Sequence, residues 1–187
     1  AQRRMTVIGD GQMGLVMAEA LACGGHQVRL WGPFPDHVEQ LARTRLSDRL
    51  PGYRLGESIE VCSDVGHALE GSDLVVCAIP CQFVRSVFAK LKHHLADSPV
   101  LVSVAKGIEI ETLERPTEIL DSIFAESGSS TVCLSGPTIA SELARHQIAI
   151  MVAASADQTA AEFVQKCFST RWLRIYTSTD VLGVEFA

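Results

Sequence analysis

The stretch Met5-Thr6-Val7-Ile8-Gly9-Asp10-Gly11-Gln12-Met13-Gly14 decides the fold of this chain. The apolar run Met5–Ile8 has the composition of a buried strand, and the next six residues match the pattern G-x-G-x-x-G. In that pattern Gly9 permits a tight turn, Gly11 lets the backbone approach a pyrophosphate, and Gly14 allows the next helix to pack closely on the strand. The helix predicted over Gln12–Cys23 begins inside the pattern, so its first amides would receive phosphate groups.

Strand patterns and helix patterns alternate along the rest of the chain. Continuous apolar runs such as Leu74–Ile79 indicate strands that are covered on both faces. The predicted strands are Met5–Ile8, Gln27–Trp31, Ile59–Cys62, Asp73–Ile79, Val100–Val104, Thr131–Leu134, Ile148–Ala153 and Trp172–Tyr176. The predicted helices are Gln12–Cys23, Pro35–Arg45, Asp64–Glu70, Gln82–Leu95, Leu113–Glu126, Ile139–Arg145 and Asp157–Cys167. This alternation predicts one α/β domain over residues 1–187, a doubly wound, mostly parallel sheet of the Rossmann type with helices on both faces.

Composition and charge exclude several classes of protein. The chain has 187 residues, of which 47% are hydrophobic, which is enough material for a packed core. Its 16 basic and 22 acidic residues give a net charge of -6, which argues against a nucleic-acid-binding domain. Uncharged stretches such as 74–84 are shorter than the about 20 residues that a membrane span needs, and the first residues lack the apolar segment of a signal peptide.

The cysteines indicate a reducing environment and predict no metal site. The six cysteines are scattered through apolar surroundings, which is typical of free, buried thiols in a cytoplasmic protein. The spacing of Cys77 and Cys81 has no second pair and no nearby histidine, so it does not match a zinc site. We therefore expect a cytoplasmic protein without a metal ion.

The end of the second strand leaves the choice between NAD and NADP open. A carboxylate at this point would bind the ribose 2′-hydroxyl of NAD, and a nearby arginine would suit the 2′-phosphate of NADP. The chain reads Arg29-Leu30-Trp31-Gly32-Pro33-Phe34, with no acid at the strand tip, and Arg29 lies within the strand. Asp36 begins the next helix, where an acid is favourable without any ligand.

Three later segments follow predicted strands, at the edge of the sheet where ligands of α/β proteins bind. Phe83 begins a helix, and from the residues alone a place in the core is favoured over a contact with a cofactor. Lys106 is either a solvated surface residue or a cation that holds a substrate oxygen or phosphate. Thr138 is expected to cap the helix that contains Glu142, so that a hydroxyl and amides would face an anionic substrate.

Several motifs together resemble the NAD(P)-dependent glycerol-3-phosphate dehydrogenase family. They are G-D-G-Q-M-G-L-V-M-A at the start, V-R-L-W-G after the first helix, A-I-P-C-Q-F in the middle, V-A-K-G at 104–107, L-S-G-P-T-I-A-S-E at 134–142 and T-D-V-L-G-V-E at the end. The resemblance covers essentially the whole chain. It implies reversible hydride transfer between a nicotinamide, of NAD or NADP, and C2 of dihydroxyacetone phosphate, which yields sn-glycerol 3-phosphate for phospholipid synthesis.

The resemblance also implies roles for individual residues. The implied cofactor contacts are Gly9, Gly11, Gln12, Met13, Gly14, Pro33, Phe83, Lys106 and Ala140. The implied substrate contacts are Lys106, Gly136 and Thr138. Lys106 is also the candidate catalytic residue, since its charge would stabilise the developing alkoxide. Pro33 departs from the family, because some relatives have a basic residue there beside the adenosine ribose, and this departure puts a preference for NADP in doubt.

A second departure lies at the end of the chain. In the family, G-V-E is followed by G-A-(L/V)-K-N, whose lysine is the general acid and base, and by an all-helical substrate domain through which relatives commonly dimerise. This sequence ends at Ala187. We therefore expect these 187 residues to bind a dinucleotide but to turn over slowly or not at all. The alternatives are an NAD(H)-binding regulatory module without chemistry, or another two-domain dehydrogenase such as a β-hydroxyacid dehydrogenase or ketopantoate reductase.

Overall fold

The computed structural model describes residues 2–95 and 98–187, and an eight-stranded sheet organises them. The strands are β1 (Arg4–Ile8), β2 (Gln27–Trp31), β3 (Ile59–Cys62), β4 (Leu74–Cys77), β5 (Val100–Ser103), β6 (Thr131–Ser135), β7 (Ala149–Ala154) and β8 (Leu173–Ser178). Their order in the sheet is β3-β2-β1-β4-β5-β6-β7-β8. The strands from β1 to β6 run parallel, in the order of a doubly wound dinucleotide-binding sheet. The predicted fold class is confirmed.

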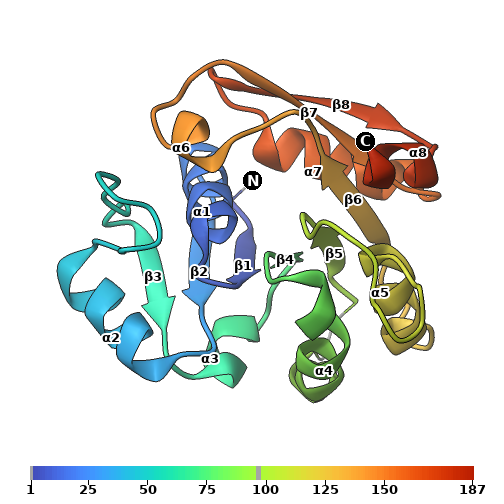
Figure 1. Ribbon diagram of the computed structural model, residues 1–187, viewed down its shortest axis with the longest axis horizontal. Coiled ribbons are helices and arrows are strands. Elements are labelled where there is room, and N and C mark those ends of the chain that lie inside the picture. The colour runs from blue at the N-terminus through green and yellow to red at the C-terminus, as the bar shows by residue number, and fades with distance from the viewer. Residues whose placement is uncertain (1, 96–97) are drawn as a thin grey trace.

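Helices cover both faces of this sheet (Figure 1). They are α1 (Gln12–Cys23), α2 (Pro35–Thr44), α3 (Val65–Leu69), α4 (Cys81–Leu91), α5 (Pro116–Phe124), α6 (Ala140–Leu143), α7 (Gln158–Phe168) and α8 (Val181–Phe186), and a 3-10 turn spans Lys92–His94. None of the helices in these described ranges is long and apolar enough to cross a membrane.

The core has two halves because successive strand residues point to opposite faces. Met5 and Val7 of β1 belong to the cluster that also contains buried residues of α1, α6 and α7. Ile8 belongs to the second cluster, with residues of α4 and α5. In this second half Phe88 and Phe124 meet edge to face, with ring centroids 6.4 Å apart. Burial on both faces explains why the central strands read as continuous apolar runs.

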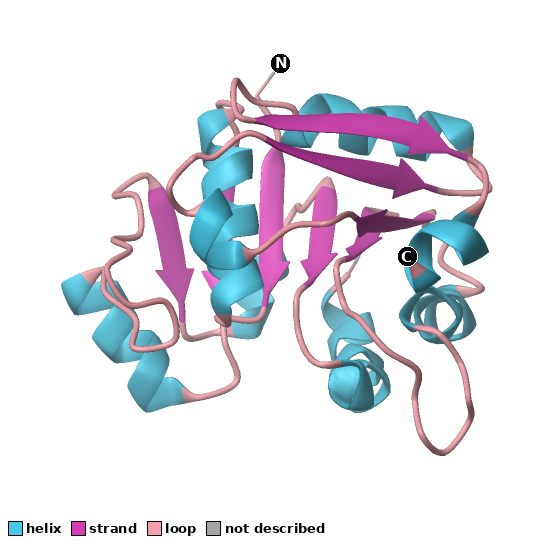
Figure 2. Ribbon diagram, turned by 45° about the horizontal axis from the view of Figure 1, so that its top comes forward, coloured by secondary structure: helices cyan, strands magenta, loops and turns pink. Residues whose placement is uncertain are grey.

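β7 reverses the direction of the sheet. It pairs antiparallel with β6, for example Leu134 with Ala153, and parallel with β8. Figure 2 shows that β7 and β8 run across the direction of the other strands. The sequence predicted a mostly parallel sheet but did not identify β7 as the strand that reverses. The connection to β7, residues 136–148, contains only the four-residue helix α6 and lacks the full helix that usually joins parallel strands.

Helix ends differ from the prediction where the backbone imposes a boundary. The helix expected over Leu113–Glu126 begins only at Pro116, because Leu113 has a φ of 61° and Pro116 occupies the first helical position. The helix expected over Gln82–Leu95 ends at Leu91 and continues as the 3-10 turn. Helix α8 was not predicted, although Asp180 caps it by accepting a bond from the Gly183 amide at 2.9 Å.

Glu185 attaches α8 to the start of α5. Its side chain is 3% exposed and accepts a bond from Arg115 Nη1 at 2.7 Å. It also accepts bonds from the Thr117 amide at 2.9 Å and from Thr117 Oγ1 at 2.6 Å. The acid of the terminal G-V-E motif therefore satisfies donors at the N-terminus of α5, and these bonds hold α8 against α5.

Candidate functional site

The glycine pattern lies where the strand order reverses, between β1 and β4. The Gly9 amide donates to the Trp31 carbonyl at 2.8 Å, and the Ala78 amide donates to the Ile8 carbonyl at 2.9 Å. These bonds hold the turn after β1 between the ends of β2 and β4. Ligands of open α/β sheets bind in the crevice outside the carboxyl ends of the strands at such a point.

Each glycine of the pattern meets a different steric requirement. Gly9 has a φ of +119°, and a Cβ there would lie 2.4 Å from the Ala78 carbonyl oxygen. A Cβ on Gly14 would lie 1.9 Å from the Gly9 carbonyl oxygen, so α1 packs on the turn without space for a side chain. A Cβ on Gly11 would meet nothing within 4 Å. Gly9 and Gly14 are thus required by packing within the chain, whereas Gly11 leaves open space at the start of α1.

Asp10 forms a buried ionic cluster beside this turn, which the sequence did not reveal. Its side chain is 2% exposed, and Arg49 Nη1 donates to its Oδ1 at 2.5 Å. His37 Nδ1 contacts the other carboxylate oxygen, and His37 Nε2 lies 3.1 Å from Ser47 Oγ. The Arg49 guanidinium also lies over the Phe34 ring, 5.3 Å from its centroid. The cluster therefore lies at the end of β2, the place that distinguishes NAD from NADP in this fold.

Lys106 lies beyond the end of β5, next to β6 and to the last residue of the chain. Its Nζ donates to Ser135 Oγ at 2.7 Å and to the Ala187 carbonyl at 3.2 Å. Ser135 is 5% exposed, so its hydroxyl is a fixed partner for a flexible lysine. The motif L-S-G-P contained this signal, because a serine at the end of a buried strand faces the same edge of the sheet.

The other predicted cofactor contacts lie on the same edge but differ in exposure. Phe83, in the first turn of α4, is 58% exposed, so the core placement favoured by the residues alone is wrong. Pro33 and Gln12 are exposed, and Met13 is half-buried against the core. Ala140, at the first position of α6, is 8% exposed and packs into the α1 side of the core. The exposed Phe83 ring is available for a ligand, whereas Ala140 offers chiefly its backbone.

Gly136 and Thr138 occupy the turn between β6 and α6. A Cβ on Gly136 would lie 2.6 Å from the Ile150 carbonyl oxygen, so packing against β7 requires this glycine. The Thr138 amide donates to the Gly136 carbonyl at 2.8 Å. The expectation that Thr138 caps α6 is wrong, because Ile139 is the capping residue and no side chain caps the helix. Glu142 does lie in the first turn, as expected.

The two cysteines at the reversal point are protected thiols. Cys77 ends β4 and is fully buried, and burial raises the pKa of its thiol to about 12. Cys81 begins α4, and burial, followed by the charges of Glu109 and Glu185, raises the pKa of its thiol. Both therefore remain protonated at neutral pH and are poor nucleophiles. All six cysteines are free, as expected, but Cys23 is exposed rather than buried.

A doubly wound sheet with a glycine turn at its reversal point and a lysine at the same edge defines a Rossmann-type domain of the nucleotide-binding class. Within that class, residues 4–161 match the family model described as "NAD-dependent glycerol-3-phosphate dehydrogenase N-terminus". The chain belongs to this family, as its motifs predicted. The expected cofactor class, NAD or NADP, agrees with the family.

Individual relatives agree with this assignment. The chain is 37% identical over 188 residues to glycerol-3-phosphate dehydrogenase [NAD(P)+] of Lactiplantibacillus plantarum, covering 98% of this chain and 56% of that protein. It is 39% identical over 181 residues to the protein of the same name from Syntrophotalea carbinolica, covering 96% and 54%. The crystal structure of glycerol-3-phosphate dehydrogenase from Coxiella burnetii has the same fold, with a TM-score of 0.89 at 24% identity, covering 98% of this chain and 56% of that one. The chain thus spans about half the length of the curated relatives that it matches.

Proposed function

We propose that residues 1–187 are the NAD(P)-binding domain of an enzyme that interconverts dihydroxyacetone phosphate and sn-glycerol 3-phosphate. The observation that supports this function best is the open space beside Gly11 at the start of α1, on the same sheet edge as Lys106. Free amides at a helix start would receive the pyrophosphate, and the exposed Phe83 ring would pack on the cofactor. Family membership supports the choice of substrate.

Lys106 has an electrostatic role in this proposal. The bound nicotinamide would supply the hydride, and its transfer to C2 turns a carbonyl into an alkoxide. A positioned cation lowers the energy of that charge as it develops, and Ser135 positions the Lys106 ammonium by accepting one of its hydrogens. Gly136 and Thr138, in the neighbouring turn, are the proposed substrate contacts. The product would supply phospholipid synthesis in the cytoplasm.

Gly11→Ala tests the dinucleotide site without disturbing the fold. A methyl group there meets no atom of the described residues within 4 Å, but it occupies the space through which a pyrophosphate would approach. We expect the Kd for NADH, measured by calorimetry, to rise at least about tenfold, while Tm stays within a few degrees of wild type. Gly25→Ala, just beyond the far end of α1, is the control for a loss of stability alone: Gly25 has a φ of +81°, so the methyl group should lower Tm and leave the Kd for NADH unchanged. Equal NADH affinity in Gly11→Ala and wild type would contradict the proposed site.

The cluster around Asp10 bears on the choice of cofactor. We propose that Arg49, whose side chain is 35% exposed at the end of β2, binds the 2′-phosphate of NADP by donating hydrogen bonds to its oxygens. Hydrogen bonds to charged groups contribute about 1.5–3 kcal/mol. In Arg49→Gln, which keeps a donor for Asp10, we therefore expect the Kd for NADPH to rise at least about tenfold and the Kd for NADH to change less than about threefold. A parallel loss of both affinities would show that Arg49 acts only through the fold.

Turnover distinguishes this function from the alternatives. We expect the 187-residue protein to bind NADH but to reduce dihydroxyacetone phosphate slowly. The lysine that would donate the proton follows G-V-E in the family and is not among these residues, and a positioned proton donor contributes about 10²–10⁴-fold to the rate. Ordinary dehydrogenase turnover by this chain would contradict that expectation. Titration of the full-length protein with dihydroxyacetone phosphate and with other keto acids separates the proposed enzyme from a β-hydroxyacid dehydrogenase or a ketopantoate reductase. No turnover with any of them would favour an NAD(H)-binding regulatory module.

A further inference from the structure

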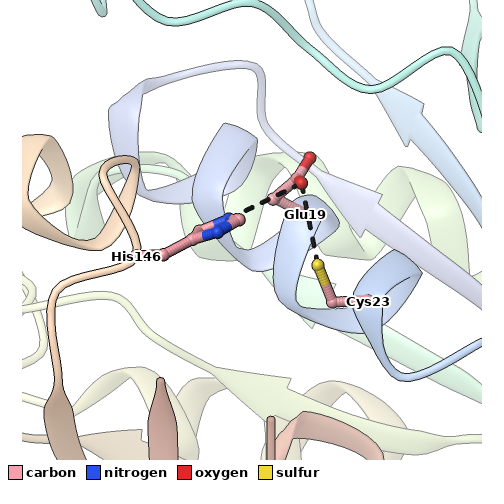
Figure 3. A group of neighbouring side chains, drawn as sticks. All are labelled: Glu19, Cys23 and His146. Carbon is pink, nitrogen blue, oxygen red and sulfur yellow. Dashed lines mark hydrogen bonds and ion pairs between the residues drawn. The ribbon is translucent and has the colours of Figure 1, made fainter. Parts of the chain in front are cut away.

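Three donor side chains of different types converge on the outer side of α1, away from the proposed dinucleotide site. Figure 3 shows Glu19 and Cys23, one turn apart on α1, facing His146 from the segment after α6. Cys23 Sγ lies 3.7 Å from Glu19 Oε1, and His146 Nε2 also lies 3.7 Å from Glu19 Oε1. The three donor atoms all lie within 4.8 Å of one another.

These separations match the edges of a tetrahedral metal site. Zinc bonds of about 2.0–2.3 Å to oxygen, nitrogen and sulfur place neighbouring tetrahedral ligands roughly 3.3–3.6 Å apart. The two distances of 3.7 Å to Glu19 Oε1 exceed this slightly, and the third separation is at most 4.8 Å, so rotation of the side chains can bring the three donors to a common ion. We propose that Glu19, Cys23 and His146 bind a divalent cation of the zinc class, with water as the fourth ligand.

The surroundings of the three side chains support this assignment. Tyr53 Oη donates to Glu19 Oε2 at 2.8 Å, so the phenol orients the carboxylate and leaves Oε1 for a cation. The His146 ring stacks on the Trp172 indole, with ring centroids 4.7 Å apart and an angle of 7° between the rings, which fixes the direction of Nε2. Glu19 and His146 also line a cavity of about 590 Å³, which leaves room for the fourth ligand. Arg54 and Arg145 line the same cavity, but Arg54 donates to Glu57 and Arg145 to the Ser141 carbonyl rather than to the Glu19 carboxylate.

The second group of donors in the described residues shows why proximity alone is insufficient. Glu60, Cys62 and His67 also lie within 4.8 Å of one another. However, the Arg29 guanidinium lies 3.1 Å from Glu60 Oε2, and His67 Nε2 lies 2.8 Å from Glu60 Oε1. The arginine already neutralises the Glu60 carboxylate, and its charge would repel a divalent ion. The group around Glu19 has no such pairing with an arginine in the described structure.

The site would join two segments that are far apart in the sequence. Cys23 ends α1, the helix that begins in the glycine pattern, and His146 follows the turn that contains Gly136 and Thr138. A bound cation would therefore stabilise the packing of α1 against α6. Since the ion binds the folded chain and the ligands are dispersed on unfolding, it should raise Tm.

The test is a titration of the metal-free protein with Co²⁺ and with Zn²⁺. We expect one equivalent of Co²⁺ to produce a thiolate-to-cobalt charge-transfer band and the visible bands of tetrahedral cobalt. Zn²⁺ should displace it and, at a hundredfold excess over Kd, raise Tm by about 5–10 °C. Cys23→Ser should abolish the charge-transfer band. Tyr53→Phe should weaken binding by roughly tenfold or more, because outer-shell partners commonly have effects of this size.

His146→Gly separates loss of the metal ligand from loss of the fold. His146 has a φ of 55°, a conformation that glycine adopts freely, so this variant should fold and keep its NADH affinity while losing the response of Tm to Zn²⁺. His67→Gln, in the second group, is the matched control and should leave both metal signals unchanged. The proposal is wrong if wild type shows no saturable cobalt spectrum, or if Cys23→Ser and His146→Gly respond to Zn²⁺ as wild type does. NADH affinity in the same variants tests the dinucleotide site separately.

Discussion

Gly14→Ala should lower the free energy of unfolding by about 3–5 kcal/mol, the largest effect expected from a single methyl group in this chain. The new Cβ would lie 1.9 Å from the Gly9 carbonyl oxygen, which belongs to the backbone and cannot rotate away. Either α1 must move off the sheet or the turn after β1 must open. The free energy of unfolding of such domains is only about 5–15 kcal/mol, so the substitution would remove a large share of the stability.

Urea denaturation monitored by circular dichroism measures this effect, and Gly11→Ala is its control. Gly11 precedes α1 as its capping residue, where alanine is somewhat less favourable than glycine, so that variant should lose at most about 1 kcal/mol. The two substitutions lie three residues apart and add the same group. If Gly14→Ala is as stable as Gly11→Ala, the close contact between α1 and the glycine turn is not a packing requirement.

Glu185→Ala should lower the free energy of unfolding by about 2–3 kcal/mol. The substitution leaves Arg115, whose side chain is 15% exposed, without its buried partner, and it removes the acceptor of the Thr117 amide and hydroxyl. Breaking a buried ion pair by removing one partner costs about 3–5 kcal/mol, and the partial exposure of Arg115 reduces this figure. Hydrogen exchange should also show faster exchange of the α8 amides, because Glu185 joins α8 to α5.

Glu57→Ala is the matched control for the ion pair. Glu57 pairs with Arg45 and Arg54, but its side chain is 70% exposed, and surface pairs of this kind contribute about 0–1 kcal/mol. We expect its urea midpoint to stay close to that of wild type. Equal midpoints for Glu185→Ala and Glu57→Ala would show that the terminal G-V-E acid is not a structural attachment.

Local sequence patterns predicted the helices and strands well, because each helix or strand depends mainly on residues that are neighbours in the sequence. The run around Val75 is apolar without alternation since β4 is covered on both faces, and that property can be read from adjacent side chains. The helix over Gln12–Cys23 was predicted to the residue, because the glycine pattern marks its start, and in the structure Gly24 caps its end. The apolar character of Phe83 alone suggested a place in the core, whereas the family motif suggested a contact with the cofactor. The structure exposes the Phe83 ring.

Side-chain clusters were missed where their members are distant in sequence. Asp10, His37 and Arg49 come from the glycine turn, from α2 and from the loop after it, and no spacing rule joins them. The cysteine spacings likewise predicted no metal site, because the proposed ligands Glu19 and Cys23 find His146 only through packing of α6 on α1. The bond between Lys106 and Ser135 follows from the neighbouring positions of β5 and β6 in the sheet.

The sequence by itself determined the order of the strands and of the helices up to α7, the glycine turn and the family, because periodicity and motifs are properties of contiguous residues. The tertiary structure alone decided the reversal at β7, the attachment of α8 through Glu185 and the gathering of charges around Asp10. These features depend on which surfaces meet once the sheet forms. The connection through α6 lacks the full helix of a parallel crossover, and β7 pairs antiparallel with β6. A buried carboxylate is stable only beside donors that packing brings to it.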